Sequence, residues 1–353
     1  MNIAYIVVLL LVGRMASAAD PLPTIASEDL AAHFEQQQPG TSQRVLVQLY
    51  NGSSGVNLIL PVTLLKGLNG GPRLAVTAAI HGDEVTGVVV LQNFLEQFDI
   101  EQLRGDIIVI PVLNPFGFAR YQRGGFAGKD LNRSFRDGSL TGEEKHYADR
   151  LLQMLKSCDL GYHVDFHTAT TNNDNSFYVR ADLSSPVAQD MARVVQPQII
   201  LNATGPGDSL RQAMTASGVH AITVEMGGPI KVNDEFVRGG VKSLSNVLRY
   251  LQMIDNVLLE NDVHHEPVVC SSSKWICTSY SGLVFEKVNI LDNVKAGDVV
   301  AEIKTMFGES VLNLTVPFDG IVIGKTDRLP VQYGARIVHV GKVERHDTDS
   351  TSK

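Results

Sequence analysis

The stretch Arg73–Leu113, RLAVTAAIHGDEVTGVVVLQNFLEQFDIEQLRGDIIVIPVL, decides the fold class. Its two ends, 73–80 and 106–113, are short apolar runs of the length and composition typical of buried strands. Between them, residues 85–98 have the apolar periodicity of a helix and follow an acidic pair that suits a helix start. A strand, a helix and a second strand in this order predict a βαβ unit with parallel strands.

The same alternation continues from this stretch to about Met253. It predicts further strands at 160–167, 176–181 and 221–226, and further helices at 142–155, 186–195, 209–217 and 236–258. Upstream, the runs 45–49 and 58–65 flank a Gly- and Ser-rich turn and predict a hairpin at the edge of the sheet. We therefore predict an α/β fold with a mostly parallel or mixed sheet and flanking helices.

After Asn261 the chain changes to short β-rich runs that are broken by Gly and Asp, which predicts a small all-β domain of about 80 residues. The predicted organisation is a leader at 1–18, an α/β domain at 19–260, an all-β domain at 261–343 and a polar tail at 344–353. Cys158, Cys270 and Cys277 are too few for a disulfide framework, and pairing of Cys270 with Cys277 stays open.

Composition limits the partners of the chain. The 353 residues carry 30 Lys and Arg against 38 Asp and Glu, a net charge of −8, so no surplus of basic residues supports nucleic-acid binding. The apolar run Ile3–Val12 is too short to span a bilayer and is followed by Ala16-Ser17-Ala18, a pattern that signal peptidase accepts. We expect an exported protein, periplasmic or secreted, with no stable membrane insertion after the leader is cleaved.

Chemistry-bearing residues lie at the ends of three predicted strands. His81 and Glu84 follow the first strand, His167 ends another and Glu225 nearly ends a third. Ligands of open α/β sheets gather at the carboxyl ends of strands. Two histidines and a glutamate with one open position are typical of a catalytic zinc, and a further carboxylate can serve as a base. His163, on the same face of its strand, is an alternative to His167.

A long Gly- and Arg-rich segment, 114–135, follows the strand that ends at Leu113, and such loops are often binding elements. Arginine binds carboxylates through paired hydrogen bonds, so this loop indicates a small anionic substrate. The alternative is that some of its arginines pair with neighbouring acids such as Asp130 or Asp137.

Five motifs occur in order: HGDE (81–84), NPFG (114–117), DLNRSF (130–135), DFHT (165–168) and VEMGGP (224–229). Together they resemble the succinylglutamate desuccinylase/aspartoacylase family of zinc carboxypeptidase-like hydrolases, over roughly residues 45–340. The resemblance implies a carboxypeptidase-like α/β domain with an appended barrel-sandwich domain.

The resemblance also implies roles for individual residues. His81, Glu84 and His167 match the ligands of one Zn²⁺ per chain, and Glu225 matches the general acid/base. Asn132 and Arg133 match the pair that binds the substrate carboxylate. Arg123 matches the arginine that stabilises the polarised carbonyl, with Arg120 as the alternative.

The leading hypothesis is a zinc-dependent deacylase that cleaves the amide bond of an N-acyl amino acid or a similar carboxylate-bearing small molecule. A metallocarboxypeptidase that acts on peptides or cell-wall peptides is the alternative within the enzymes. A non-catalytic zinc- or ligand-binding protein is the alternative of a different class. The sequence decides neither the acyl group and amino acid nor whether the chain forms a homo-oligomer.

Overall fold

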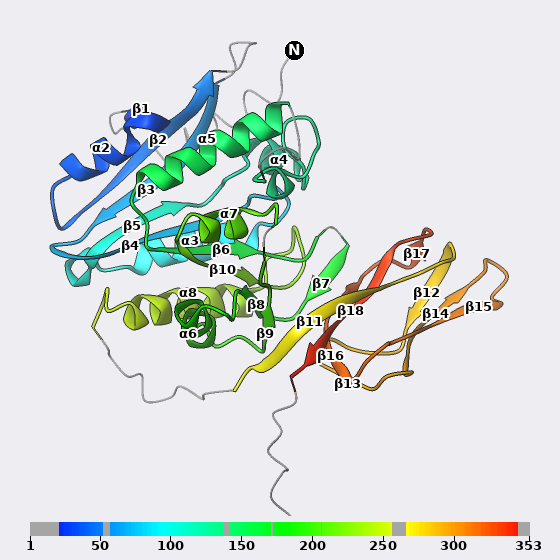
Figure 1. Cartoon of the computed structure of the whole chain (residues 1–353). Coiled ribbons are helices and arrows are strands. Elements are labelled where there is room, and N and C mark those ends of the chain that lie inside the picture. Colours follow the sequence, from blue (N-terminus) through cyan, green and yellow to red (C-terminus); the bar gives the residue numbers. More distant parts are fainter. Residues whose placement is uncertain are drawn as a thin grey trace, which may run out of the picture.

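The computed structural model describes residues 21–51, 57–136, 142–170, 172–205, 207–255 and 266–344 (Figure 1). The predicted leader at 1–18 lies outside these residues, as do the predicted domain boundary at 260/261 and the tail beyond Glu344. Within the described part, no helix is both long enough and apolar enough to cross a membrane.

Among the described residues, a mixed sheet of 14 strands forms the centre of the molecule. Its order is β1-β2-β3-β5-β4-β6-β10-β8-β9-β11-β18-β16-β13, and β7 pairs with β16 beside this path. The strands are β1 (Thr24–Ala26), β2 (Thr41–Asn51), β3 (Asn57–Lys66), β4 (Asn69–Ala78), β5 (Arg104–Ile110), β6 (Tyr162–His167), β7 (Asn173–Asn175), β8 (Tyr178–Ala181), β9 (Ile199–Asn202), β10 (His220–Glu225), β11 (Val268–Cys277), β13 (Asn293–Val294), β16 (Gly320–Thr326) and β18 (Arg336–Val343).

Helices cover both faces of this sheet. The helices are α2 (Leu30–Gln36), α3 (Thr86–Gln97), α4 (Pro115–Arg120), α5 (Glu143–Ser157), α6 (Pro186–Val194), α7 (Leu210–Ala216) and α8 (Asp234–Tyr250), with single 3-10 turns η1 (Ser27–Asp29), η2 (Ile100–Gln102) and η3 (Leu131–Arg133). One core lies under α3, α6 and α8, and the other under α2, α5 and α7.

The strands of the sheet contribute to both cores because their side chains alternate in direction. Leu74 and Val76 of β4 belong to the core under α3, whereas Ala75 between them belongs to the core under α5. Burial on both faces accounts for the continuous apolar runs from which the strands were predicted. At one edge, β2 and β3 form the predicted hairpin, and β3 pairs with β5.

The C-terminal β-domain, residues 266–344, is continuous with the central sheet. Its first strand, β11, pairs in parallel with β9, and β18, β16 and β13 extend the sheet further. The remaining strands, β12 (Gly282–Glu286), β14 (Val299–Lys304), β15 (Ser310–Thr315) and β17 (Pro330–Val331), form a separate four-stranded sheet. Apolar side chains from both sheets form one cluster. The predicted α/β fold with an appended small β-domain is confirmed.

Several elements differ from the sequence-based prediction. The segment 114–135 contains the helix α4 and the turn η3 rather than loop alone, and the short strands β7 and β9 were not predicted. The helix predicted over 236–258 ends at Tyr250, because Gln252 adopts a left-handed backbone with a φ of 57° and the chain turns there. Cys270 and Cys277 are free, since both lie on the one strand β11.

Candidate metal centre

The three strands that carry the predicted site residues are neighbours in the sheet. β6 lies between β4 and β10 and is parallel to both, so their carboxyl ends meet at one edge. Glu225 is the direct register partner of His167. Paired residues of adjacent strands direct their side chains to the same face, which brings these two groups to one side of the sheet.

The HGDE turn after β4 is held against the NPFG segment. An added Cβ at Gly82 would lie 1.9 Å from the backbone carbon of Gly117, so only glycine permits this close approach. The side chain of Asn114 caps α4 by accepting from the N–H of Gly117 at 2.9 Å, and it donates to the carbonyl of Ile80 at 3.2 Å. Two of the five motifs therefore form one rigid corner at the site.

His81, Glu84 and His167 converge at this corner, and all three are buried. The Nδ1 atom of His81 lies 2.8 Å from Oε1 of Glu84, and the Nδ1 atom of His167 lies 2.9 Å from Oε2 of the same carboxylate. One potential ligand atom from each residue falls within 4.8 Å of the others. The structure thus brings together the three residues that were predicted as metal ligands.

The other nitrogen of each imidazole, Nε2, lies beside an aspartate carboxylate. Nε2 of His81 lies 3.1 Å from Oδ1 of Asp130, and Nε2 of His167 lies 2.8 Å from Oδ2 of Asp165. A carboxylate accepts hydrogen bonds, so each can hold a proton on Nε2, and a neutral ring held in this way has its lone pair on Nδ1, the nitrogen that faces Glu84. Carboxylates that orient ligating histidines in this way are typical of zinc sites.

The alternative ligand, His163, does not belong to the cluster of His81, Glu84 and His167. Its Nε2 atom is 2.8 Å from the hydroxyl oxygen of Thr77, which donates to Oδ1 of Asp165 at 2.6 Å. His163 is therefore tied to Asp165 through Thr77, and the geometry favours His167 at the ligand position.

Several properties of the cluster fit a divalent cation. In the part of the chain that the structure describes, the buried Nδ1 atom of His81 has no hydrogen-bond partner of good geometry, although it faces an oxygen of Glu84 at 2.8 Å. A cation bound by both atoms would stabilise two acceptors that lie this close together. Burial alone would lower the pKa of His167, yet the carboxylates of Asp165 and Glu84 raise it well above its usual value. The same field favours positive charge at the centre of the cluster.

Arg123 lies directly at this centre. Its guanidinium donates to Oε1 of Glu84 at 2.9 Å and to Oδ2 of Asp130 at 3.1 Å. The alternative pairing of a loop arginine with Asp130 therefore occurs at Arg123, and it places Arg123 beside the potential ligands. Arg120, the alternative, is exposed at the end of α4.

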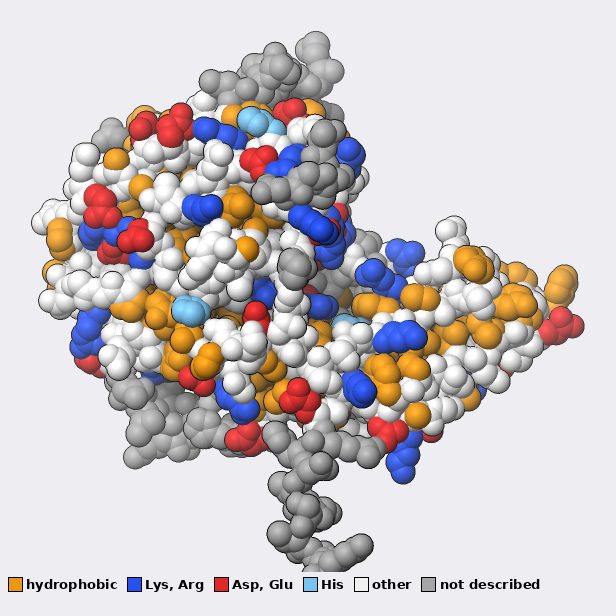
Figure 2. Space-filling model, in the orientation of Figure 1, with side chains coloured by type: hydrophobic (Ala, Val, Ile, Leu, Met, Phe, Trp, Pro, Cys, Tyr) orange, Lys and Arg blue, Asp and Glu red, His pale blue; other side chains and the backbone are white. Residues whose placement is uncertain are grey.

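Asn132 and Arg133 lie on η3, next to the residue that supports His81. The side-chain oxygen of Asn132 accepts from the N–H of Leu210 at 2.7 Å, which joins η3 to the start of α7. The exposed guanidinium of Arg133 donates to the carbonyl of Asn132 at 2.7 Å. Lys and Arg side chains gather around the hollow between the α/β part and the C-terminal β-domain (Figure 2).

Glu225 has polar partners that were not predicted from the sequence. The side-chain amide of Asn175 donates to its Oε2 at 3.3 Å, and the guanidinium of Arg180 donates to its Oε1 at 3.2 Å. Arg180 also donates to the phenol oxygen of Tyr178. The sequence did contain a signal for one of these partners. Arg180 lies between Val179 and Ala181 in a buried strand, and a buried charge needs a partner.

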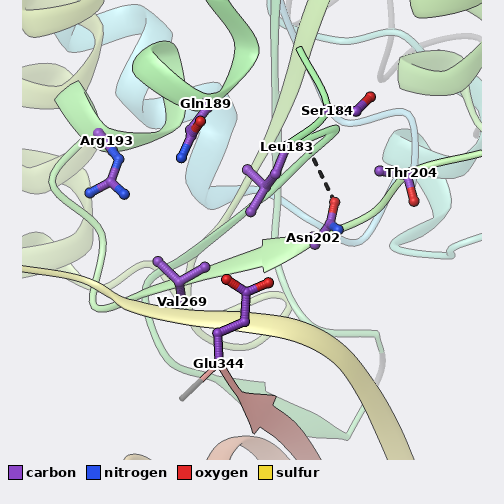
Figure 3. Close-up of a pocket in the computed structure, with 8 residues that line it drawn as sticks. All are labelled: Leu183, Ser184, Gln189, Arg193, Asn202, Thr204, Val269 and Glu344. Atoms are coloured by element: carbon purple, nitrogen blue, oxygen red, sulfur yellow. Dashed lines mark hydrogen bonds between the residues drawn. The ribbon is translucent and has the colours of Figure 1, made fainter. Parts of the chain in front are cut away.

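A hollow of about 350 Å³ lies elsewhere, beside the carboxyl ends of β8 and β9 (Figure 3). Because β8 is antiparallel to β10, these ends lie at the opposite edge of the sheet from His167 and Glu225. The hollow is lined by Leu183, Ser184, Gln189, Arg193, Asn202, Thr204, Val269 and Glu344. It contains none of the predicted site residues, so we assign the chemistry to the His81 cluster.

The chain resembles known proteins in sequence. The family model of the succinylglutamate desuccinylase/aspartoacylase catalytic domain matches residues 70–251. An N-α-acetyl-L-2,4-diaminobutyric acid deacetylase of Halomonas elongata is 25% identical over 303 residues, which cover 81% of this chain and 86% of the relative.

Solved structures resemble the chain in fold. The product-bound ectoine utilization protein of Ruegeria pomeroyi has a TM-score of 0.75 at 19% identity, covering 86% of this chain and 95% of its own. A succinylglutamate desuccinylase/aspartoacylase of Rhodobacter sphaeroides has a TM-score of 0.74 at 19% identity, with 86% and 96% covered.

Proposed function

Because the chain belongs to the succinylglutamate desuccinylase/aspartoacylase family, as its motifs predicted, we propose that it is a zinc-dependent deacylase. Its substrate would be an N-acyl amino acid or a similar small molecule with a carboxylate, and the products would be an acid and an amine. The observation that carries this proposal is the cluster of His81, Glu84 and His167 at the strand ends, with Glu225 in register beside it.

The donor set fits zinc. Two imidazole nitrogens and one carboxylate, with a further position open, are the ligands of a catalytic zinc site. A zinc ion there would supply Lewis acidity, which activates water at neutral pH and polarises a carbonyl group. His81, Glu84 and His167 would hold the ion, and Asp130 and Asp165 would keep the two imidazoles oriented.

Glu225 is suited to handle the proton of this reaction. Its carboxylate is held on the same side of the sheet as His167. We assign it the proton that leaves the attacking water, and then the transfer of that proton to the departing nitrogen as the amide bond breaks. One carboxylate acting first as base and then as acid leaves the enzyme unchanged after each turnover.

Three further side chains would bind the substrate. The guanidinium of Arg123 lies at the cluster, where a cation stabilises negative charge that develops on the carbonyl oxygen. Asn132 and Arg133 would bind the substrate carboxylate, and the guanidinium of Arg133 is exposed for this contact. Anchoring at the carboxylate would position the amide bond over the metal ligands.

A substrate screen of the zinc-loaded protein tests the proposal. The panel contains N-acetyl and N-succinyl amino acids, N-acetyldiaminobutyrate and C-terminally free peptides, and both acid and amine release are measured. Release of acid and amine from N-acyl amino acids supports the deacylase. Cleavage confined to peptides would indicate a metallocarboxypeptidase, and failure to bind zinc would indicate a non-catalytic ligand-binding protein.

A further inference from the structure

The proposed base Glu225 is held by both of its oxygens. Asn175 donates to Oε2 at 3.3 Å and Arg180 donates to Oε1 at 3.2 Å. With only 8% of the residue exposed, little water is available to replace either partner. The orientation of the carboxylate therefore depends on how these two residues are themselves anchored.

Asn175 is anchored by the C-terminal β-domain. It lies on β7, and among the described residues this strand pairs with β16 and with no other strand. Asn175 is the register partner of Gly324, and the next residue, Ser176, donates its backbone N–H to the carbonyl of Ile323 at 2.8 Å. The strand that presents Asn175 to Glu225 is thus positioned by a strand about 150 residues later in the sequence.

Arg180 is anchored through Tyr178. The phenol oxygen accepts from Nε of Arg180 at 3.1 Å and from Nη2 at 2.7 Å. Burial alone would lower the pKa of Arg180, but Tyr178 and Glu225 raise it, so the guanidinium remains charged.

The ring of Tyr178 in turn packs against the C-terminal β-domain. It is 1% exposed, lies in an apolar cluster with residues of β11 and β16, and contacts His339 edge to face at 6.4 Å between centroids. His339 is fixed by stacking on Trp275 at 4.7 Å and by the hydroxyl of Ser273 at 2.8 Å. Both partners of Glu225 are therefore supported by strands that follow residue 266.

We propose that the C-terminal β-domain orients the catalytic carboxylate, with Asn175, Arg180 and Tyr178 as positioning residues that act through Glu225. This inference rests on the proposed function and assigns that domain a part in the chemistry. We call the contacts of Asn175 and Arg180 with the two oxygens of Glu225 the clamp. Loss of either contact would let the carboxylate turn away from His167. A displacement of about 1 Å costs up to roughly 100-fold in rate, while substrate contacts made elsewhere stay unchanged.

Gly324→Ala disturbs the clamp from within the C-terminal β-domain. A Cβ at this position would lie 2.3 Å from the side-chain oxygen of Asn175 and 2.6 Å from the carbonyl of Asp174, so β7 must shift. We expect kcat to fall roughly 10- to 100-fold with KM within about twofold and full zinc content. Gly70→Ala is the steric control, because an added Cβ there meets nothing within 4 Å.

Arg180→Ala opens the other side of the clamp and permits chemical rescue. We expect a similar loss of kcat, and partial recovery when free guanidinium is added to this variant but not to Gly324→Ala. A protein that had merely lost structure would not respond to guanidinium. Lys325 follows Gly324 on β16 and forms an ion pair with Glu286 of β12, so Lys325→Ala removes this ion pair and should keep the wild-type kcat.

Crystal structures of the wild type and of Gly324→Ala provide a readout that needs no substrate. The clamp predicts that the Glu225 carboxylate has moved in the variant, and a carboxylate in its wild-type position would overturn the inference. So would wild-type kcat in both clamp variants, or an Arg180→Ala loss that guanidinium does not restore. If the wild type hydrolyses no member of the panel, the proposed function fails, and the crystal structures still decide the clamp.

Discussion

Replacing Asp165 by Asn should weaken zinc binding by about 100-fold while the protein stays folded. The carboxylate of Asp165 accepts from Nε2 of His167 at 2.8 Å and from the hydroxyl of Thr77 at 2.6 Å. An asparagine oxygen can still accept from His167, and its amide can donate to Thr77 if that hydroxyl turns toward His163. The shape of the network is thus preserved, and the change removes the negative charge.

The magnitude follows from the burial of this charge. Loss of a carboxylate behind a metal-binding histidine typically costs 10- to 100-fold in metal affinity. Asp165 is 1% exposed, so no water replaces the lost charge, and we expect the upper end of that range, about 2.7 kcal/mol.

The assay is a competition of zinc between the protein and a chelator of known affinity, with thermal unfolding of the metal-free protein as a check on folding. Asp99→Asn is the matched control, since this exposed aspartate caps η2 beyond the C-terminal end of α3, whereas the HGDE turn precedes the start of that helix. A Kd for zinc in Asp165→Asn within threefold of the wild type would refute the claim that Asp165 sets the orientation and basicity of His167.

Three further predictions concern the proposed chemistry and the leader. Glu225→Gln should retain one zinc per chain and lose turnover, whereas His81→Ala should lose both, as measured by elemental analysis and amine release; near-normal rates in Glu225→Gln would exclude its role as base. Arg133→Ala should raise KM for substrates with a carboxylate, and an equal rise for their amides would argue against carboxylate binding. We expect the chain to be exported and its mature form to begin at Ala19 in intact-mass measurement, and a chain that retains Met1 would contradict a cleaved leader.

The cluster of candidate ligands was predictable because each of its residues lies at or just after the end of a strand that the sequence itself indicates. Strand ends can be located from apolar runs, and residues at the carboxyl ends of adjacent parallel strands must meet. His81 and Glu84 are three residues apart across one turn, and His167 ends a predicted strand, so only the adjacency of β4 and β6 remained to be established by the structure.

The partners of Glu225 were not predictable in the same way. Arg180 was correctly assigned to a strand, but alternation alone does not say which charge on the neighbouring strand it meets. Asn175 lies on a three-residue strand with no apolar pattern, whose partner β16 is distant in sequence. Periodicity detects what a segment buries, and it does not detect which distant segment supplies a polar partner.

The two halves of the metal centre differ in how they are built. Asp165 lies two residues before His167 on β6, so the sheet itself forms the oriented imidazole and its support. Asp130 reaches His81 from the arginine-rich loop 49 residues away, and the same carboxylate holds Arg123. The support of His81 therefore comes from a different part of the chain, the segment 114–135. Because Asp130 accepts from both His81 and Arg123, one carboxylate of this segment holds a candidate metal ligand and the proposed oxyanion arginine together.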